Sequence, residues 1–265
     1  MKISILGCGW LGLPLARHFL QKGYKIKGST TNKQKLSLLE EAGITPYLIS
    51  LSPQIVGDIE AFLENAEVSI INIPPQRRQK GDTFHPQQIE HLLPYLQKAD
   101  LKQIIYVSAT SVYPELNKEV GEEEATRVAN PALWDSEQLL QNTLKGKVCT
   151  LRLGGLMGDD RVAGKYFAGK KNLKTGGTPV NYIHRDDAIG IITKVIEQEI
   201  KNEVLNVVAP QHPTRKEVYL HQAQKYGFEA PTFVATTTDY KQVSTEKLRN
   251  LLNYTFQYPD PLNFK

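Results

Sequence analysis

The chain has 265 residues, of which 40% are hydrophobic and 23% charged, and a formal net charge of +4. This length suits one large globular domain or a main domain with a smaller one. No apolar run reaches the roughly 18–20 residues that cross a bilayer, and the first predicted strand begins beside Met1, which leaves no room for a signal peptide.

Short apolar strands alternate with amphipathic helices through about the first 150 residues, the pattern of a parallel sheet with helices on both faces. The predicted strands are residues 2–6, 24–29, 46–51, 68–73, 103–108 and 147–152. A helix follows the first strand, Asn32 caps a second that ends at Gly43, and residues 86–99 form a third.

Beyond residue 153 this regularity weakens, and seven glycines between 154 and 177 mark a region rich in loops. A helix then follows Asp187, a strand spans 203–208, and two helices lie near 214–226 and 245–252. We therefore expect a core at 1–153 and a small lobe at 154–265, with segments that return to the core.

The first strand ends in a G-x-G-x-x-G turn that opens a helix. Gly7 permits the tight turn, Gly9 lets the backbone approach a pyrophosphate, and Gly12 lets helix and strand pack closely. The free N–H groups and the dipole of the helix favour phosphates. The sequence therefore predicts a dinucleotide site that includes these glycines together with Trp10 and Leu11.

The two cysteines, Cys8 and Cys149, fall in or beside predicted strands. They do not have the spacing of metal ligands, so we predict no metal site and a reducing, cytoplasmic compartment. We expect both to pack as small hydrophobic side chains. The modest net charge suits an anionic cofactor and gives little support for nucleic-acid binding.

Four segments together resemble the extended short-chain dehydrogenase/reductase superfamily, also called the NAD-dependent epimerase/dehydratase family. They are residues 7–12, 104–114, 151–158 and 180–188. The short chain and its glycine turn are most similar to the atypical subgroup. The resemblance implies an α/β fold, a Rossmann-type doubly wound parallel sheet with a small C-terminal substrate lobe, in which ligands bind at the carboxyl ends of the strands.

The resemblance also implies a catalytic set that this chain lacks. Active members use a serine or threonine, a tyrosine, and a lysine four residues after the tyrosine, which together with the nicotinamide lowers the pKa of that tyrosine. Anchored on Tyr113, these positions fall on Ala109, Trp134 and Gln138. None of these three side chains is an acid or base at neutral pH.

The proton donor is therefore open among three candidates: Tyr113, a phenol; Glu137, on the helix that carries the family's catalytic pair; and Ser108, which a one-residue slip of the alignment places in the hydroxyl role. Glu137 is alternatively solvent-exposed or in a salt bridge, and Tyr113 alternatively packs structurally. Ser108 is also a predicted cofactor contact, and the predicted substrate contacts are Thr110, Ser111, Trp134 and Arg161.

The end of the second strand indicates the choice of cofactor. NAD enzymes place an acid there for the ribose 2′-hydroxyl, but residues 28–35 contain none. Thr30 and Thr31 are suited to contact a 2′-phosphate, and Lys33 or Lys35 to neutralise it. The alternative is an ordinary helix cap with solvated lysines. We favour NADP(H), with NAD(H) as the alternative.

Two further features have a functional and a structural interpretation, and a third is structural. Pro74 follows the fourth strand and forms either a stiff wall beside the cofactor or merely a rigid exit from the strand. The basic residues of the run 76–80 either bind a phosphate or carboxylate or belong to a solvated loop. His184 precedes a helix that Asp186 caps, with Asp187 favouring the helix dipole in the first turn.

We expect an NADP(H)-dependent oxidoreductase or epimerase-like enzyme for a small polar or sugar-linked substrate, with a homodimer as an open question. The alternative is a non-catalytic NADP(H) sensor or regulatory module, which the missing catalytic set favours. A hydroxyacid dehydrogenase with the same glycine turn is disfavoured. That architecture has a long all-helical C-terminal domain, whereas residues 154–265 of this chain are predicted to contain loops and a strand as well as helices.

Overall fold

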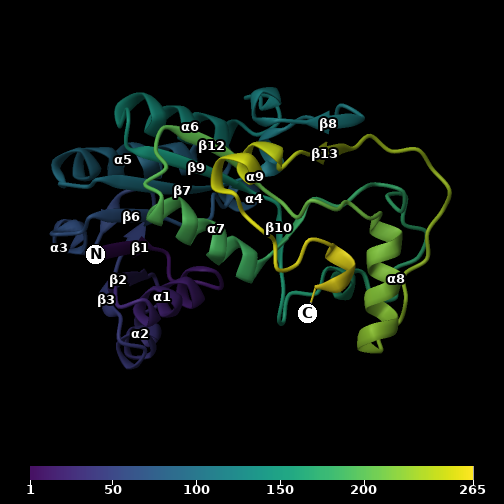
Figure 1. Ribbon diagram of the computed structural model, residues 1–265, viewed down its shortest axis with the longest axis horizontal. Coiled ribbons are helices and arrows are strands. Elements are labelled where there is room, and N and C mark those ends of the chain that lie inside the picture. The colour runs from purple at the N-terminus through teal and green to yellow at the C-terminus, as the bar shows by residue number, and fades with distance from the viewer. Residues whose placement is uncertain (265) are drawn as a thin grey trace. The chain divides into compact units, whose positions relative to one another are not determined.

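The computed structural model describes residues 1–264 and contains a seven-stranded sheet in the order β12-β9-β7-β6-β1-β2-β3 (Figure 1). The pairs β1–β2, β2–β3, β1–β6 and β6–β7 are parallel. The strands are β1 (Lys2–Leu6), β2 (Lys25–Thr30), β3 (Thr45–Leu48), β6 (Val68–Ile71), β7 (Gln103–Ala109), β9 (Val148–Leu153) and β12 (Glu203–Val207). The direction of strand addition reverses beside β1, where ligands bind in doubly wound folds.

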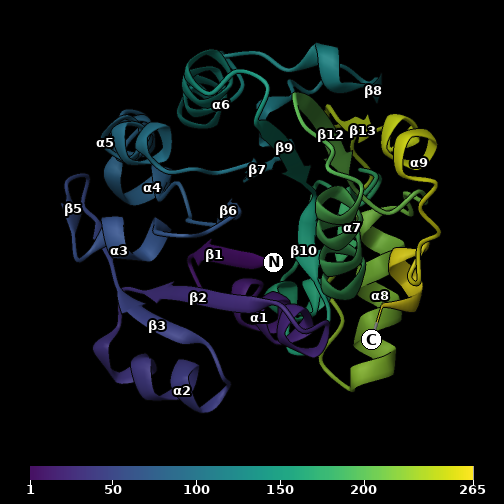
Figure 2. The same cartoon turned by 60° about the vertical axis from the view of Figure 1, so that its left-hand side comes forward.

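The chain forms two compact units. The first comprises residues 1–112, 126–151 and 192–204, and the second the rest of the described chain. Helices of the first unit are α1 (Gly12–Gln21), α2 (Leu36–Glu41), α3 (Ile59–Leu63), α4 (Arg77–Lys80), α5 (Phe84–Lys98) and α6 (Pro131–Thr143). Figure 2 shows α5 and α6 on one face of the sheet and α1 on the other.

Local sequence explains the main helices of the first unit. In α1, Leu15, Ala16 and Phe19 are fully buried, which is the stripe that a 3.6-residue period places against the sheet. In α6, the side chain of Asn130 accepts a hydrogen bond from the amide of Leu133, so it caps the helix. Strands β1, β6, β7 and β9 are buried along nearly their whole length, because a parallel sheet is covered on both faces.

A polar network crosses this core between β7 and α5. The buried His85 ring contacts Gln88 Oε1 through Nδ1 at 2.9 Å and the Tyr106 hydroxyl through Nε2 at 2.8 Å. Since Gln88 Oε1 only accepts, Nδ1 carries the proton and Nε2 accepts from Tyr106. Burial lowers the pKa of His85 and raises that of Tyr106. The ring is therefore held neutral.

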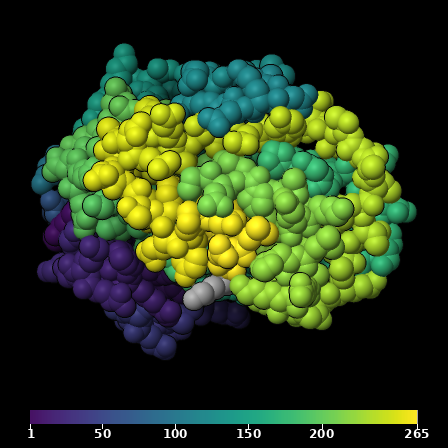
Figure 3. Space-filling model, turned by 45° about the vertical axis from the view of Figure 1, so that its right-hand side comes forward, coloured from purple at the N-terminus to yellow at the C-terminus, as the bar shows by residue number. Residues whose placement is uncertain are grey.

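The second unit contains two small parallel pairs, β8 (Lys118–Val120) with β13 (Lys241–Val243) and β10 (Gly155–Met157) with β11 (Tyr182–His184). Its helices include α8 (Arg215–Tyr226) and α9 (Glu246–Leu252). In the space-filling view the yellow C-terminal segment lies beside the yellow-green α8 (Figure 3), and Lys225 Nζ donates to the carbonyl of Phe264 at 3.0 Å.

The remaining elements are short or belong to both units. Helix α7 (Arg185–Glu197) begins in the second unit and ends in the first. A small hairpin joins β4 (Ser50–Leu51) to β5 (Ile55–Val56). The 3₁₀ turns within residues 1–264 are η1 (Lys33–Lys35), η2 (Thr110–Val112), η3 (Glu122–Glu124), η4 (Ala163–Phe167) and η5 (Pro261–Asn263).

The predicted fold class is confirmed, but several local predictions are wrong. The predicted strand 46–51 is broken at Ile49 into β3 and β4, and the predicted helix 32–43 is a 3₁₀ turn followed by α2. Asp186 does not cap α7, because the helix already begins at Arg185. Instead, the ring nitrogen Nδ1 of His184 accepts a hydrogen bond of 3.2 Å from the backbone amide of Asp186. The domain boundary at residue 153 stays a prediction.

Asp187 does more than interact with the helix dipole, because it also binds the C-terminal segment. Its carboxylate is fully buried and accepts from the Tyr254 hydroxyl at 3.0 Å, the Gln257 amide at 2.8 Å and the Tyr258 amide at 2.9 Å. The His184 ring stacks on Tyr258 with 3.8 Å between ring centroids. These contacts hold the C-terminal segment within the second unit.

Candidate dinucleotide site

The turn between β1 and α1 requires glycine at two positions and leaves space at a third. Gly7 has a φ of +105°, and a Cβ there would lie 2.3 Å from the Asn72 carbonyl oxygen. A Cβ on Gly12 would lie 2.2 Å from the Gly7 carbonyl oxygen. Around Gly9 no described atom lies within 4 Å of the Cβ position. The backbone at Gly9 is thus not crowded by other parts of the described chain, and its contact with a cofactor stays a prediction.

Two side chains that the sequence analysis missed brace this turn. The hydroxyl of Ser29 accepts the Gly7 amide at 2.9 Å, and the side-chain amide of Asn72 donates to the Gly7 carbonyl at 2.9 Å. Ser29 lies in β2 and Asn72 follows β6, the two strands that flank β1. Both side chains lie at the carboxyl ends of strands next to β1, which brings them to the glycine turn.

Cys8 lies in the same turn as a packed thiol. It is buried, its Sγ lies 3.8 Å from the carbonyl oxygen of Ile5, and a Cβ on Gly28 would lie 2.7 Å from that sulfur. Burial raises the pKa of the thiol to about 12, so it stays protonated at neutral pH. Cys149 is also buried. Both therefore pack as predicted.

The N-terminus of α1 fits an anion. The first amides of any α-helix lack partners within the helix. Here the capping residue is Leu11, which supplies no side-chain hydrogen bond, and the first turn contains no acidic residue. No carboxylate of the first turn therefore interacts with the positive end of the helix dipole. Together with the open face of Gly9, this arrangement fits a pyrophosphate.

Of the predicted cofactor contacts at the end of β2, some shape the turn and others are exposed. The Thr30 hydroxyl accepts the Asn32 amide at 3.1 Å, and Asn32 Oδ1 accepts the Gln34 amide at 2.9 Å, so both shape the turn. Thr31 and Lys33 are exposed. Within residues 1–264 no carboxylate pairs with Lys33. These two side chains are thus free to meet a ligand.

Ser108, at the end of β7, contacts the predicted catalytic helix. Its hydroxyl donates to Glu137 Oε1 at 2.5 Å, and both residues are buried, with exposed fractions of 4% and 1%. On α6, Trp134 and Gln138 are half-buried. The positions of the family's tyrosine and lysine thus carry an indole and an amide, with a buried carboxylate between them in the sequence.

The other candidates at this strand end have separate surroundings. Thr110 is buried in the 3₁₀ turn η2, and the exposed Ser111 accepts the side-chain amide of Asn130 at 2.9 Å. Pro74 is exposed after β6. As substrate or cofactor contacts, these residues stay predictions.

Tyr113 and Arg161 belong to the second unit. The hydroxyl of the buried Tyr113 donates to Asn206 Oδ1 and accepts from Arg152 Nη1 at 2.8 Å. This arrangement supports the structural alternative for Tyr113. The half-buried Arg161 closes a tight turn, since its amide donates to the Gly158 carbonyl at 2.9 Å.

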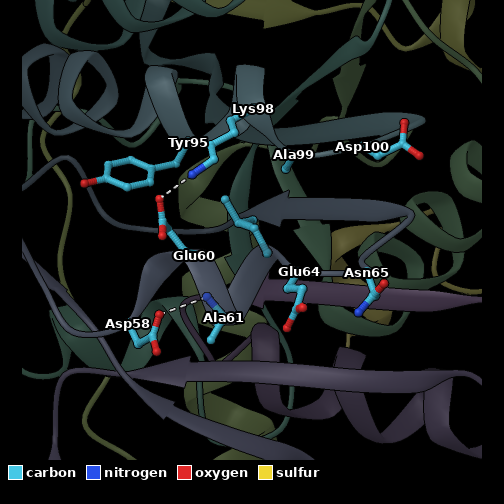
Figure 4. Close-up of a pocket in the computed structure, with 10 residues that line it drawn as sticks. Asp58, Glu60, Ala61, Glu64, Asn65, Tyr95, Lys98, Ala99 and Asp100 are labelled. Carbon is cyan, nitrogen blue, oxygen red and sulfur yellow. Dashed lines mark hydrogen bonds and ion pairs between the residues drawn. The ribbon is translucent and has the colours of Figure 1, made fainter.

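A pocket of about 520 Å³ lies at the opposite edge of the sheet from the glycine turn (Figure 4). Its residues come from α3 and the end of α5 and precede β6 and β7, so they lie at the amino ends of those strands. Four of them are carboxylates: Asp58, Glu60, Glu64 and Asp100. Such a surface repels phosphates.

No group of three or more His, Cys, Asp or Glu side chains within residues 1–264 is arranged to hold a metal ion. Over the same residues, no helix is long and apolar enough to span a membrane.

Comparisons with known proteins agree with this geometry. The family model for the NAD binding domain of 6-phosphogluconate dehydrogenase matches residues 2–130. A short-chain dehydrogenase/reductase superfamily protein from Agrobacterium tumefaciens, solved with bound NAD, is 14% identical with a TM-score of 0.78, over 99% of this chain and 94% of that one. UDP-glucuronic acid 4-epimerase from Bacillus cereus in complex with NAD is 18% identical with a TM-score of 0.77, over 100% and 97%. These likenesses in structure show that the chain has the Rossmann-type fold of these NAD-bound proteins.

A curated relative has higher sequence identity. Protein YeeZ of Escherichia coli strain K12 is 33% identical over 272 residues, which cover 98% of this chain and 97% of YeeZ. The chain belongs to the family of YeeZ. The strand pairs of the second unit differ from the all-helical domain expected of a hydroxyacid dehydrogenase.

Proposed function

We propose that this protein is a cytoplasmic NADP(H)-dependent oxidoreductase or epimerase-like enzyme that acts on a small polar or sugar-linked substrate. The observation that carries the proposal is the open backbone at Gly9, at the N-terminus of α1 and braced by Ser29 and Asn72. The Bacillus cereus relative in fold, solved with NAD and UDP-glucuronic acid, supports a sugar-linked substrate.

The preference for NADP(H) rests on the end of β2. The loop there has no acidic residue to accept a ribose 2′-hydroxyl, and it exposes Thr31 and Lys33. A lysine beside a 2′-phosphate makes a charge-assisted hydrogen bond, which contributes about 1.5–3 kcal/mol. NAD(H) has no such phosphate and gains nothing from this lysine.

The residues of the chain bind and orient, while the nicotinamide, when bound, supplies or accepts the hydride. The amides at the start of α1 hold the pyrophosphate, and Pro74 limits the space beside β6. Glu137 Oε1 accepts a hydrogen bond from the Ser108 hydroxyl, which places a hydroxyl and a carboxyl group side by side at the end of β7. We assign proton transfer to this pair, since Trp134 and Gln138 replace the family's tyrosine and lysine.

A second candidate function has its own observation. The half-buried Trp134 and Gln138 stand where the family has its acid and its lysine. A site that binds NADP(H) without a proton relay suits a sensor or regulatory module. Turnover is what distinguishes this alternative from an enzyme.

The proposed function is tested by two measurements on the intact protein. Calorimetric titration measures the affinity for NADPH and NADH, and NADPH oxidation is then followed across a panel of small aldehydes and ketones. Tight NADPH binding with turnover supports the enzyme. Tight binding with no turnover across the panel favours the sensor, and the absence of binding contradicts both.

A further inference from the structure

The two edges of the sheet in the first unit differ in charge. The loops after β2 and β6, residues 31–35 and 72–83, contain five basic residues and one acidic residue. The loops before β6 and β7, residues 57–67 and 98–102, contain five acidic residues and two basic ones. The basic edge is the one that carries the glycine turn.

The two edges also differ in how their charges are neutralised. At the acidic edge, Lys98 pairs with Glu60 at 2.9 Å and Lys102 with Glu67 at 2.8 Å. Figure 4 shows the Lys98 ammonium group directed at Glu60. Each basic side chain of these two loops therefore has a carboxylate partner within the protein.

At the basic edge, most of the cations that follow β6 are not paired with a carboxylate of the described chain. Arg77 pairs with Asp82. Arg78 and Lys80, both exposed, have no carboxylate partner among residues 1–264. The Lys80 ammonium lies 5.9 Å from the centre of the Phe84 ring, a contact that orients a cation without neutralising it.

The backbone holds these cations in one short turn. Pro74 and Pro75 fix the chain as it leaves β6. Gln76 has a φ of +49°, and its carbonyl accepts the amides of Gln79 and Lys80, each at 2.9 Å. Arg78 is therefore presented on a closed turn rather than on an extended loop.

The strand order separates this turn from the residues proposed to select NADP(H). Strand β1 lies between β6 and β2, with about 4.8 Å between neighbouring strands. Lys33 therefore lies on the β2 side of the glycine turn, and Arg78 and Lys80 on the β6 side. A dinucleotide in this fold lies across the switch point, with its adenosine ribose toward the end of β2. The β6 side is left for the other half of the cofactor and the substrate.

We propose that the substrate carries an anionic group, a phosphate or a carboxylate, that Arg78 and Lys80 bind. The inference rests on the proposed dinucleotide site and adds the chemical class of the substrate. The planar guanidinium group of Arg78 matches two oxygens of either anion, and Lys80 adds a second positive charge. A neutral carbonyl compound makes neither contact.

The test uses ¹⁵N-labelled full-length protein saturated with NADPH, so that the cofactor already fills the pyrophosphate site. The side-chain Nε–Hε resonance of Arg78, assigned by its loss in Arg78→Lys, is followed while inorganic phosphate or acetate is added at constant ionic strength. We expect a saturable shift. We also expect Lys80→Gln to weaken that binding at least tenfold, whereas Lys145→Gln, which changes an exposed lysine elsewhere in the unit, leaves it unchanged.

Each outcome decides between the two proposals. A saturable response to phosphate alone indicates a phosphate ester as substrate, and a response to acetate alone indicates a carboxylate. NADPH binding without a saturable shift, or with an equal shift in Lys80→Gln, overturns the inference and leaves the proposed function standing. Failure of the wild-type protein to bind NADPH overturns the proposed function, and the inference with it.

Discussion

Ser108 and Glu137 form a buried hydrogen bond of 2.5 Å that joins the end of β7 to the middle of α6. Glu137 lies on the helix where the resemblance to the short-chain dehydrogenase/reductase superfamily places a tyrosine and a lysine. The hydrogen bond joins two of the predicted catalytic candidates. A carboxylate that accepts a hydrogen bond from a hydroxyl group has the contact that a general base needs.

We predict that Glu137→Gln lowers turnover at least about 100-fold, because general acid–base help contributes roughly 10²–10⁴ in rate. Glutamine keeps an oxygen that accepts from Ser108 and loses only the ionisable group, so NADPH affinity should not change. Steady-state kinetics with calorimetry checks both values. Glu90→Gln, at an exposed carboxylate of α5, is the matched control. Full activity in Glu137→Gln excludes the pair as the proton donor.

Tyr113→Phe should act on stability rather than on turnover. The Tyr113 hydroxyl is buried between Arg152 and Asn206, and its loss leaves both partners with an unmet hydrogen bond, at a cost of about 1–3 kcal/mol. Chemical denaturation measures that cost. A large loss of turnover with unchanged stability identifies Tyr113 as the donor instead.

The sequence predicts the strands that flank the site and the glycine turn, because both depend on local patterns. It did not predict the braces Ser29 and Asn72, whose partner Gly7 lies 22 and 65 residues away. The sequence also did not predict that His184 accepts a hydrogen bond from the Asp186 amide at the start of α7. Nor did it predict that Asp187 accepts hydrogen bonds from the C-terminal segment. Apart from the contact of His184, these contacts join residues distant in the chain, and no local period encodes them.

Lys33→Ala should reduce any preference for NADPH over NADH. The variant removes one charge-assisted contact to the 2′-phosphate, so NADPH affinity should fall by about 1.5–3 kcal/mol while NADH affinity stays constant. Calorimetric titration with both cofactors is the measurement, and Lys145→Ala is the control. Equal losses for the two cofactors mean that Lys33 does not read the 2′-phosphate.

Gly9→Val should abolish dinucleotide binding and preserve the fold. The space around Gly9 accommodates a side chain within the protein, but valine methyl groups would occupy the place where the pyrophosphate meets the backbone. Circular dichroism checks the fold, and fluorescence of bound NADPH checks the site. Gly177→Val, at an equally open glycine of the second unit, should bind normally. Unchanged affinity in Gly9→Val refutes the site.

Asp187→Asn should release the C-terminal segment. The fully buried carboxylate accepts three hydrogen bonds from residues 254–258, and a hydrogen bond to a charged group contributes about 1.5–3 kcal/mol. Hydrogen exchange at the amides of Gln257 and Tyr258 should become faster. Asp186→Asn, one residue away and 43% exposed in its side chain, should leave these two amides protected.

Acid should destabilise the first unit through His85. Burial lowers the pKa of His85 in the folded state below the ordinary 6.5, which is its value in the unfolded chain. Below that pH the unfolded chain binds more protons than the folded protein, so stability is full above about pH 6.5 and falls as the pH decreases, by up to about 1.4 kcal/mol per pH unit. Denaturation between about pH 7.5 and 5 measures this slope while most carboxylates remain ionised.

His85→Gln should reduce the slope of stability against pH, because it removes the titrating ring, even though the variant is less stable at neutral pH. His91→Gln, at an exposed histidine of α5, should keep the wild-type slope, and an equal slope in His85→Gln would contradict the buried neutral ring.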